Sequence, residues 1–146
     1  MNHANILPFK ALKLEYIAPN ELKRVWSEIL PGLQKVAKTQ THWIPEDVYM
    51  ALMAGACNLH MGYQDGEYVG FLITQQQEQY GITALHIWAA YSEGVDLLEV
   101  TMEQIREWAK AINADRITFS SSRRGWARTG TKLGFEPTMT IYEMTL

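Results

Sequence analysis

Three strand-like runs in the middle of the chain constrain its fold more than any other feature. Residues 58–63 and 68–74 flank the dipeptide Asp65-Gly66, and a third run covers residues 82–91. Asp-Gly between two such runs is the strongest short-range signal for a β-hairpin, because both residues tolerate a positive φ. We therefore predict an antiparallel meander of three strands, with residues 75–79 as a polar strand end and loop.

The residues before this meander predict one strand and several helices. Residues 12–17 alternate between apolar and polar side chains, which indicates a strand. Residues 22–30 carry apolar side chains at i, i+3, i+4, i+7 and i+8, the spacing of an amphipathic helix. We predict that Pro31-Gly32 ends this helix and that a short second helix covers residues 33–37. Pro45 marks the first turn of a third helix.

The residues after the meander continue with helices and strands. Apolar side chains at helical spacing predict one long helix over residues 98–112. A strand over residues 117–120 and a short helix over residues 125–132 follow, and Gly134 marks the end of that helix. Residues 139–146 alternate and predict a final strand that closes the chain.

The composition fits one globular domain over residues 1–146 and excludes some partners. The mass is 16.7 kDa and the net charge is −3, so no global positive field attracts nucleic acid or an anionic membrane. Cys57 is the single cysteine, which excludes an internal disulfide and fits a reducing compartment. Residues 1–9 lack a signal-peptide pattern, and no apolar run reaches the roughly 18–20 residues that span a bilayer. We expect a cytoplasmic protein, or one packaged into a virion from the cytoplasm.

The order of the predicted elements resembles that of the GNAT superfamily of N-acetyltransferases. Residues 64–71, Gln-Asp-Gly-Glu-Tyr-Val-Gly-Phe, are similar to the family's second hairpin, and residues 132–137, Lys-Leu-Gly-Phe-Glu-Pro, to its exit from the last helix. The resemblance covers nearly the whole chain from Leu12. It implies an α/β fold with a mixed, mostly antiparallel, twisted sheet of about six strands and helices on both faces. Residues 124–135 also resemble degenerate GNAT-like proteins of tailed phages.

The resemblance implies an acetyl-CoA site at the turn between the fourth strand and the long helix. The family places an Arg/Gln-x-x-Gly-x-Gly/Ala segment there, whose backbone N–H groups meet the pyrophosphate. The matching residues 90–96, Ala-Tyr-Ser-Glu-Gly-Val-Asp, hold one glycine, no arginine and two carboxylates. A carboxylate about 4 Å from a phosphate charge costs roughly 1–4 kcal/mol. We therefore favour the interpretation that Ser92, Glu93 and Asp96 cap the helix and that the pyrophosphate signature is degenerate.

Residues on both sides of the expected slot would contact acetyl-CoA if the protein binds it. The pantetheine arm would enter between residues 87–91 and 118–120, where the small Ala89 and Ala90 allow a close approach. The positions that the resemblance implies for cofactor contacts are Ile87, Trp88, Ala89, Ala90, Ser92, Glu93, Gly94, Val95, Ser120, Arg123 and Arg128.

Two proton-transfer positions of the family are changed in this chain. The tyrosine that protonates the leaving thiolate falls on Gly130, and the asparagine that opens that segment falls on Arg123. Tyr91 could replace the missing acid, or it could be a core or rim residue at a strand end. His86 is the candidate base for the acceptor amine, because its unperturbed pKa near 6.5 suits that role. The alternative for His86, which we favour, is a half-buried histidine bonded within the sheet.

A cluster of basic residues follows the strand at residues 117–120. Arg123, Arg124 and Arg128 lie near Trp126 in an otherwise acidic chain. Such a cluster could hold phosphate, a nucleic-acid backbone or an acidic protein partner, with Trp126 stacking on the ligand. It could equally be a solvated basic turn with Trp126 packed inward, and both interpretations stay open.

Two further pairs of residues bear on function. Cys57 and His60 share a C-x-x-H spacing, but residues three apart on a strand face opposite sides, so we expect no metal site. His42 and Trp43 could line an acceptor site.

Two functions stay open. One is an N-acyltransferase that uses acetyl-CoA on a small-molecule or protein amine, and the other is a non-catalytic binding or structural protein, such as a virion component, an inhibitor or an adaptor.

Overall fold

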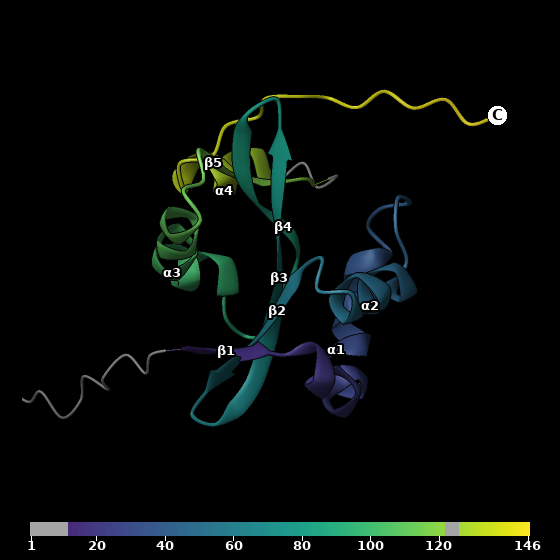
Figure 1. Cartoon of the computed structure of the whole chain (residues 1–146), viewed down its shortest axis with the longest axis vertical. Helices are drawn as coiled ribbons and strands as arrows, with labels where there is room; N and C mark the ends of the chain where they lie inside the picture. Colours follow the sequence, from purple (N-terminus) through teal and green to yellow (C-terminus); the bar gives the residue numbers. More distant parts are fainter. Residues whose placement is uncertain (1–11, 122–125) are drawn as a thin grey trace, which may run out of the picture.

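The computed structural model describes residues 12–121 and 126–146 of the chain (Figure 1). A single 3₁₀ turn, Pro19–Glu21, links the first strand to the first helix. The elements in chain order are β1 (Lys13–Ile17), α1 (Leu22–Ala37), α2 (Pro45–Met53), β2 (Asn58–Gln64), β3 (Glu67–Gln79), β4 (Ile82–Ser92), α3 (Leu97–Ala111), β5 (Arg116–Phe119) and α4 (Trp126–Lys132).

The strands form one mixed sheet in the order β1-β2-β3-β4-β5. The first four strands are antiparallel neighbours, and β5 runs parallel to β4. A parallel neighbour requires a crossover, and α3 supplies it between β4 and β5. The mixed, mostly antiparallel α/β fold is confirmed, with five strands in place of the expected six.

Two tight turns build the central meander. Asp65 and Gly66 between β2 and β3 have φ values of 56° and 78°, so the predicted hairpin is confirmed. Tyr80 and Gly81 have φ values of 53° and 77° and form the same kind of two-residue turn between β3 and β4. Residues 75–79 form a strand end as predicted, but the predicted loop there was wrong, because these residues pair with β4 up to Gln79–Ile82. Residues 76–79 are all exposed, so solvent reaches both faces of this end of the hairpin and accommodates a run of polar side chains.

Helices cover both faces of the sheet, and each face has its own apolar core (Figure 1). On one face α1 and α2 pack against side chains of β2, β3 and β4, with Ile29, Leu33, Val48 and Phe71 fully buried. On the other face α3 packs against Leu72, Leu85 and Ile87. The sheet is therefore the middle layer of three.

The predicted helix break at Pro31 was wrong, since α1 continues through it to Ala37. Ile29, Gly32 and Leu33 are buried on either side of the proline, while Pro31 itself is exposed. Burial of that continuous face offsets the roughly 3 kcal/mol that a proline costs inside a helix. No separate helix therefore covers residues 33–37.

The predicted final strand over residues 139–146 is also not formed. The chain leaves α4 at Lys132 and has no helix or strand from Phe135 to Leu146. A strand exists only where a neighbour completes its ladder of backbone hydrogen bonds. An alternating sequence alone therefore did not give a strand here.

His60 is enclosed on the α3 face of the sheet. Its ring stacks on Trp108 at 4.2 Å between centroids, and the Tyr16 ring lies tilted to it at 5.6 Å. Its Nδ1 atom is buried and has no hydrogen-bond partner among the described residues. Burial disfavours the charged imidazolium, so the pKa of His60 is lowered to about 4.

We predict that His60 makes the fold less stable as the pH falls from 6.5 to 4. The unfolded chain takes up this proton near pH 6.5 and the folded chain only near pH 4, so acid favours unfolding in that window. His60→Phe keeps the ring stacking and removes the titration, so its urea midpoint should fall less over this window than that of the unmodified chain. His42→Phe, at an exposed position, should behave like the unmodified chain, and equal pH profiles for His60→Phe and the unmodified chain would contradict the assignment.

A substitution at Gly70 tests how closely β3 and β4 approach each other. A Cβ atom at Gly70 would lie 2.1 Å from the backbone oxygen of Tyr91, whereas a Cβ at Gly130 in α4 meets ordinary contacts at 3.6 Å. We predict that Gly70→Ala lowers the free energy of unfolding by about 2 kcal/mol or more. Gly130→Ala should raise it by up to about 1 kcal/mol, because alanine favours the helix. Urea unfolding of both variants measures this, and a neutral Gly70→Ala would refute the close approach.

Candidate functional site

The parallel pairing between β4 and β5 ends in the middle of β4. All four residues of β5 pair with residues 84–87 of β4, and the last pair joins Ile87 to Phe119. β4 continues to Ser92, and no strand of the described residues lies beside this part on the β5 side. The edge of residues 88–92 that faces away from β3 therefore has no strand partner among the described residues, and Ala89 within it is buried.

A β-bulge at Trp88 coincides with the end of this pairing. The register between β3 and β4 shifts by one residue between Ile73 and Thr74, which leaves Trp88 as an extra residue in β4. A bulge bends its strand and shifts the side-chain alternation beyond it. His86 and Ala89, three residues apart, consequently share the face of the sheet that α1 and α2 cover.

His86 bridges β4 and β5 on that face. Its Nδ1 atom lies 2.8 Å from Oγ1 of Thr118, which is the residue opposite it in the parallel pairing. Burial lowers the pKa of His86, so the ring is neutral at neutral pH. When Nδ1 carries the proton and donates it to Thr118, the Nε2 lone pair is available to accept a proton from a substrate.

The loop between α1 and α2 brings a second aromatic side chain to this face. Trp43 packs edge-to-face on Trp88 with 6.0 Å between ring centroids. The side chain of Gln40 holds this loop in place, because its oxygen accepts the N–H groups of His42 and Trp43 and its nitrogen donates to the Trp43 carbonyl. Trp43 therefore lies beside Trp88, while His42 forms an exposed ion pair with Glu143 at 3.5 Å.

Tyr91 lies on the same face but is engaged by charged neighbours. Its hydroxyl bonds to Glu93 and accepts a hydrogen bond from Lys35 Nζ at 3.2 Å. Lys35 and Glu93 also form an ion pair at 3.8 Å, and the Tyr91 hydroxyl and that carboxylate raise the pKa of Lys35. The Tyr91 ring fits over Gly32 of α1, where a Cβ atom would lie 2.4 Å from the ring. The Tyr91 side chain therefore fixes α1 to the end of β4.

Side chains of the chain itself cap the start of α3. Asp96 is the N-cap residue, and its Oδ1 accepts the N–H of Glu99 at 3.2 Å. Ser92 Oγ lies 3.4 Å from the N–H of Leu97. Gly94 has a φ of 73°, which allows the chain to turn into the helix. The exposed carboxylates of Glu93 and Asp96 thus lie at the helix end where a pyrophosphate would need positive charge.

The structure separates the other candidate contacts. Ala89 faces the α1 and α2 core and Ala90 the α3 core, while Val95 packs against the α3 core. Ser120 is exposed just past β5, and Arg128 is exposed on α4. Arg123 and Arg124 lie outside the described residues, and of Trp126 only the backbone in α4 is described.

Sequence reasoning missed Thr118 and Lys35. Thr118 lies within the predicted strand 117–120, but its position opposite His86 depends on the register of two strands separated by α3. Lys35 lies in the part of α1 that was expected beyond a helix break at Pro31. Correct pairing and an unbroken helix would have brought both residues to this face.

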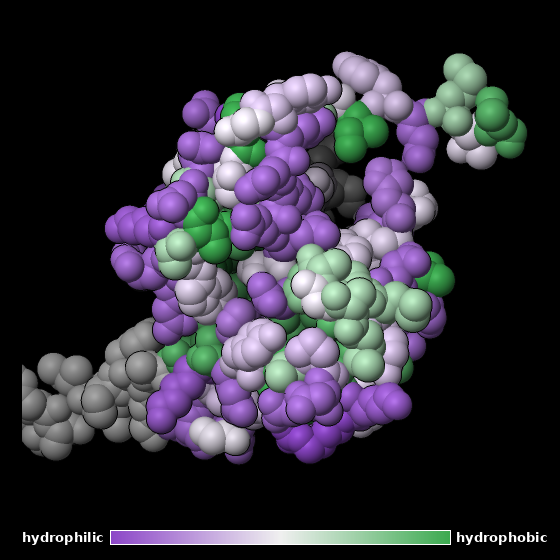
Figure 2. All heavy atoms as spheres, in the orientation of Figure 1, coloured by the Kyte–Doolittle hydropathy of each residue, from purple (hydrophilic) through white to green (hydrophobic). Residues whose placement is uncertain are grey.

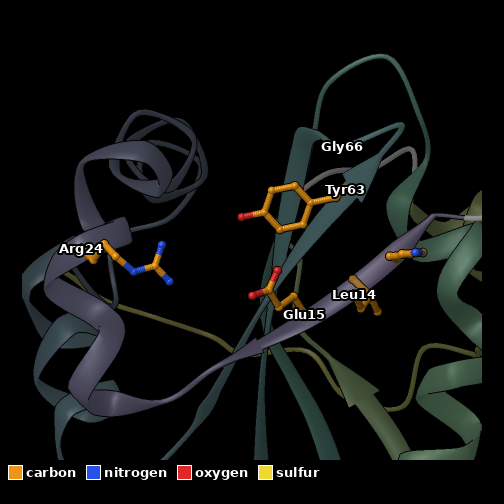
Figure 3. Close-up of a pocket in the computed structure, with 6 residues that line it drawn as sticks. Leu14, Glu15, Arg24, Tyr63 and Gly66 are labelled. Carbon is orange, nitrogen blue, oxygen red and sulfur yellow. The ribbon is translucent and has the colours of Figure 1, made fainter.

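A cavity of about 580 Å³ lies elsewhere, between α1, β1 and the turn that joins β2 to β3 (Figure 3). Figure 3 shows the guanidinium of Arg24 facing the hydroxyl of Tyr63 across it, with Glu15 beneath. Its lining residues are Lys13, Leu14, Glu15, Arg24, Tyr63 and Gly66. None of these lining residues belongs to β4 or β5, so this cavity is distinct from the site around His86.

These features define a mixed α/β fold in which the parallel pairing of β4 and β5 ends in the middle of β4. The structure is similar to an aminoglycoside acetyltransferase from an uncultured soil metagenomic sample, with a TM-score of 0.67, 15% identity, and coverage of 92% of this chain and 96% of the other. It is similar to glucosamine-6-phosphate N-acetyltransferase from Arabidopsis thaliana, with a TM-score of 0.63, 10% identity and coverage of 93% and 99%. It is also similar to the aminoglycoside N-acetyltransferase AAC(6')-Iy in complex with CoA, with a TM-score of 0.62, 13% identity and coverage of 96% and 98%.

These likenesses show that the chain has the GNAT acetyltransferase fold. The sequence matches no protein-family model and no curated protein. Among the described residues, no helix is long and apolar enough to cross a bilayer.

The N-cap of α3 gives a direct test of the geometry beside the slot. We predict that Asp96→Ala lowers the free energy of unfolding by about 1 kcal/mol, because the N–H of Glu99 loses its acceptor. Asp96→Asn keeps an oxygen at the same place and should cost less than half as much. Thermal and urea unfolding distinguish the two variants, and equal losses would contradict the capping role.

Proposed function

We propose that this protein is an N-acyltransferase that moves an acyl group from a thioester to a small-molecule amine, with His86 as the proton acceptor. The observation that carries the proposal is the position of His86 at the point where β4 and β5 part. There the Trp88 bulge begins, a backbone edge is open, and a neutral imidazole is held by Thr118. The proposed base, His86, and the unpaired edge that begins at Trp88 therefore lie within three residues of each other along β4.

The residues of the slot fit the pantetheine arm of acetyl-CoA, although the start of α3 does not fit its pyrophosphate. An extended arm that carries amide groups can pair with the open edge of residues 88–92, as an added strand does. Ala89 is buried and Ala90 half-buried, and their small side chains would allow the arm a close approach to that edge. The thioester would supply an acyl carbon that is open to attack by an amine. Glu93 and Asp96 repel phosphate groups at the helix end, so we infer that affinity for acetyl-CoA comes from the arm.

His86 would accept the proton that the amine loses as its nitrogen bonds to the acyl carbon. Thr118 holds Nδ1, which orients the ring and leaves Nε2 for this proton. The lowered pKa keeps the ring neutral and ready to accept a proton at neutral pH. Tyr91 remains the candidate donor to the departing thiolate. Its hydroxyl donates to Glu93 and accepts a hydrogen bond from Lys35, whose ammonium would replace a proton that the hydroxyl gives to the thiolate.

The aromatic pair of Trp43 and Trp88 suits an amine acceptor. Tryptophan faces attract ammonium groups, and this pair lies on the face of the sheet that His86 occupies. The similar solved proteins are acetyltransferases of aminoglycosides and of glucosamine 6-phosphate. We therefore propose amino sugars and related polyamines as the first acceptor class to test.

We predict that His86→Gln lowers kcat/KM by about 100-fold or more while the fold is retained. The assay follows thiol release from acetyl-CoA with a panel of aminoglycosides and amino sugars. Burial lowers the pKa of His86, so the neutral base persists below pH 6.5 and the acid limb of the kcat/KM profile should lie below that pH. Thr118→Val should shift this limb and reduce the rate less than His86→Gln does.

His60→Phe is the matched control for this experiment. It removes a half-buried histidine from the opposite face of the sheet and should leave kcat/KM per folded molecule unchanged. Activity of His86→Gln equal to that of His60→Phe would remove His86 from the proposal. If the unmodified chain and both variants are inactive on every acceptor of the panel, this result would count against the acyltransferase.

The carboxylates at the start of α3 favour a second candidate, a GNAT-fold protein that binds a macromolecule without catalysis. In that case the N–H groups of Leu97 and Glu99 are permanently satisfied by Ser92 and Asp96. A partner would bind through the basic cluster Arg123, Arg124, Trp126 and Arg128, in a role such as virion component, inhibitor or adaptor. Thermal shift with millimolar acetyl-CoA distinguishes the candidates, since stabilisation favours the enzyme and its absence favours the binding protein.

A further inference from the structure

We propose that the cavity between α1, β1 and the β2–β3 turn binds a small zwitterion, a molecule with one ammonium and one carboxylate group, such as a free amino acid. The inference is independent of the proposed acyl transfer, because the cavity and the site around His86 share no residue. It is carried by side chains of opposite charge that line one space in the part of the chain that the structure describes and form no ion pair with each other.

Strand register places three of the lining side chains on one face of the sheet. Lys13 of β1 is the residue opposite Tyr63 of β2, and Glu15 follows two residues after Lys13, so all three face the side that α1 covers. Arg24 lies in the first turn of α1. Figure 3 shows the Tyr63 hydroxyl, the Glu15 carboxylate and the Arg24 guanidinium around one space. Residues distant in the sequence therefore supply both signs of charge to the same cavity.

The charged groups of the cavity are available to a ligand. Arg24 Nη2 donates to Glu21, one turn earlier, at 3.1 Å in an exposed ion pair. Such a pair contributes little to stability, and a guanidinium has five N–H donors, so Arg24 can also bind a carboxylate of the ligand. The side chains of Lys13 and Glu15 form no ion pair with any residue that the structure describes. Two cations and one carboxylate are thus left for a ligand.

Tyr63 lies close to charges of both signs. Burial and the carboxylates of Glu28 and Glu15 raise the pKa of Tyr63, and Arg24 acts on it in the opposite direction. The hydroxyl is therefore protonated at neutral pH and can donate to an anionic oxygen. It contacts the Met61 sulfur at 3.8 Å, which is a weak acceptor that a carboxylate oxygen would replace. The face of the Tyr63 ring attracts an ammonium group.

The mixture of charges determines the class of ligand. Lys13 and Arg24 would attract a simple anion that Glu15 repels, and a simple amine would meet the reverse. A zwitterion can direct its carboxylate to the two cations and its ammonium to Glu15, so that each charge meets its opposite.

The surroundings and the size of the cavity also fit a small polar ligand. Figure 2 shows hydrophilic side chains at the end of the molecule where α1 begins and the β2–β3 turn lies, whereas apolar side chains gather over α2. A volume of about 580 Å³ lies in the range of small-molecule sites and holds an amino acid together with water.

Heteronuclear NMR titration of the full chain tests the proposal with four compounds of equal carbon number. The zwitterions are α-aminobutyrate and γ-aminobutyrate, and the singly charged controls are butylamine and butyrate. At least one zwitterion should shift the amide signals of Tyr63 and Gly66 in a saturable way and bind about 10-fold or more tightly than either control. The signals of His86 and Thr118 should not move. Absence of saturable shifts, equal affinity for all four compounds, or shifts confined to His86 and Thr118 would overturn the proposal.

Two charge-removing variants test the assigned contacts. Arg24→Gln and Glu15→Gln should each weaken binding of the zwitterion by about 10-fold or more. Arg106→Gln is the matched control, because Arg106 also forms an exposed ion pair with a carboxylate three residues before it, Glu103, but lies on α3. It should bind the zwitterion as the unmodified chain does. All three positions are exposed, so urea midpoints close to that of the unmodified chain should confirm that the variants fold. Affinities of Arg24→Gln and Glu15→Gln equal to that of Arg106→Gln would overturn the proposal.

Discussion

The end of the parallel pairing between β4 and β5 is the constraint on which the rest of the site depends. β5 leaves β4 after Ile87, and the bulge at Trp88 adds one residue to β4 at that point. The added residue shifts the alternation of side chains, so His86 and Ala89 face one side although they are three apart. Without the bulge, Ala89 would face α3 and would not pack in the core that α1 and α2 cover.

The sequence was sufficient for those parts of the fold that are encoded locally. The Asp65-Gly66 turn, the apolar face of α3 and the strand at β5 are each determined by residues within a few positions of one another. The order of these elements then left few topologies, and the GNAT acetyltransferase fold is one of them. His86 was identifiable for the same reason, because it is the histidine of the last strand of the meander.

The remaining features depend on contacts between distant residues, which local patterns do not encode. α1 runs through Pro31 because Ile29 and Leu33 are buried on either side of it, and the Tyr91 ring fills the space over Gly32. The partnership of His86 with Thr118 requires the register of β4 and β5, which α3 separates by a long crossover. The expected strand at residues 139–146 failed for the converse reason, since the pattern was present but no neighbour completed its ladder.

Under the proposed function, the edge of β4 and the start of α3 would have separate tasks in binding a donor. The slot beside residues 88–92 depends on backbone geometry, which the bulge preserves whatever the side chains are. The start of α3 depends on side chains, and here Asp96 already caps the helix and complements its dipole. An incoming phosphate would have to displace that cap and approach two carboxylates, Glu93 and Asp96, at a cost of about 1–4 kcal/mol for each close contact. Under the proposed function, a donor that places its charge away from α3 would avoid this cost, so its arm would contribute more to binding than its phosphates.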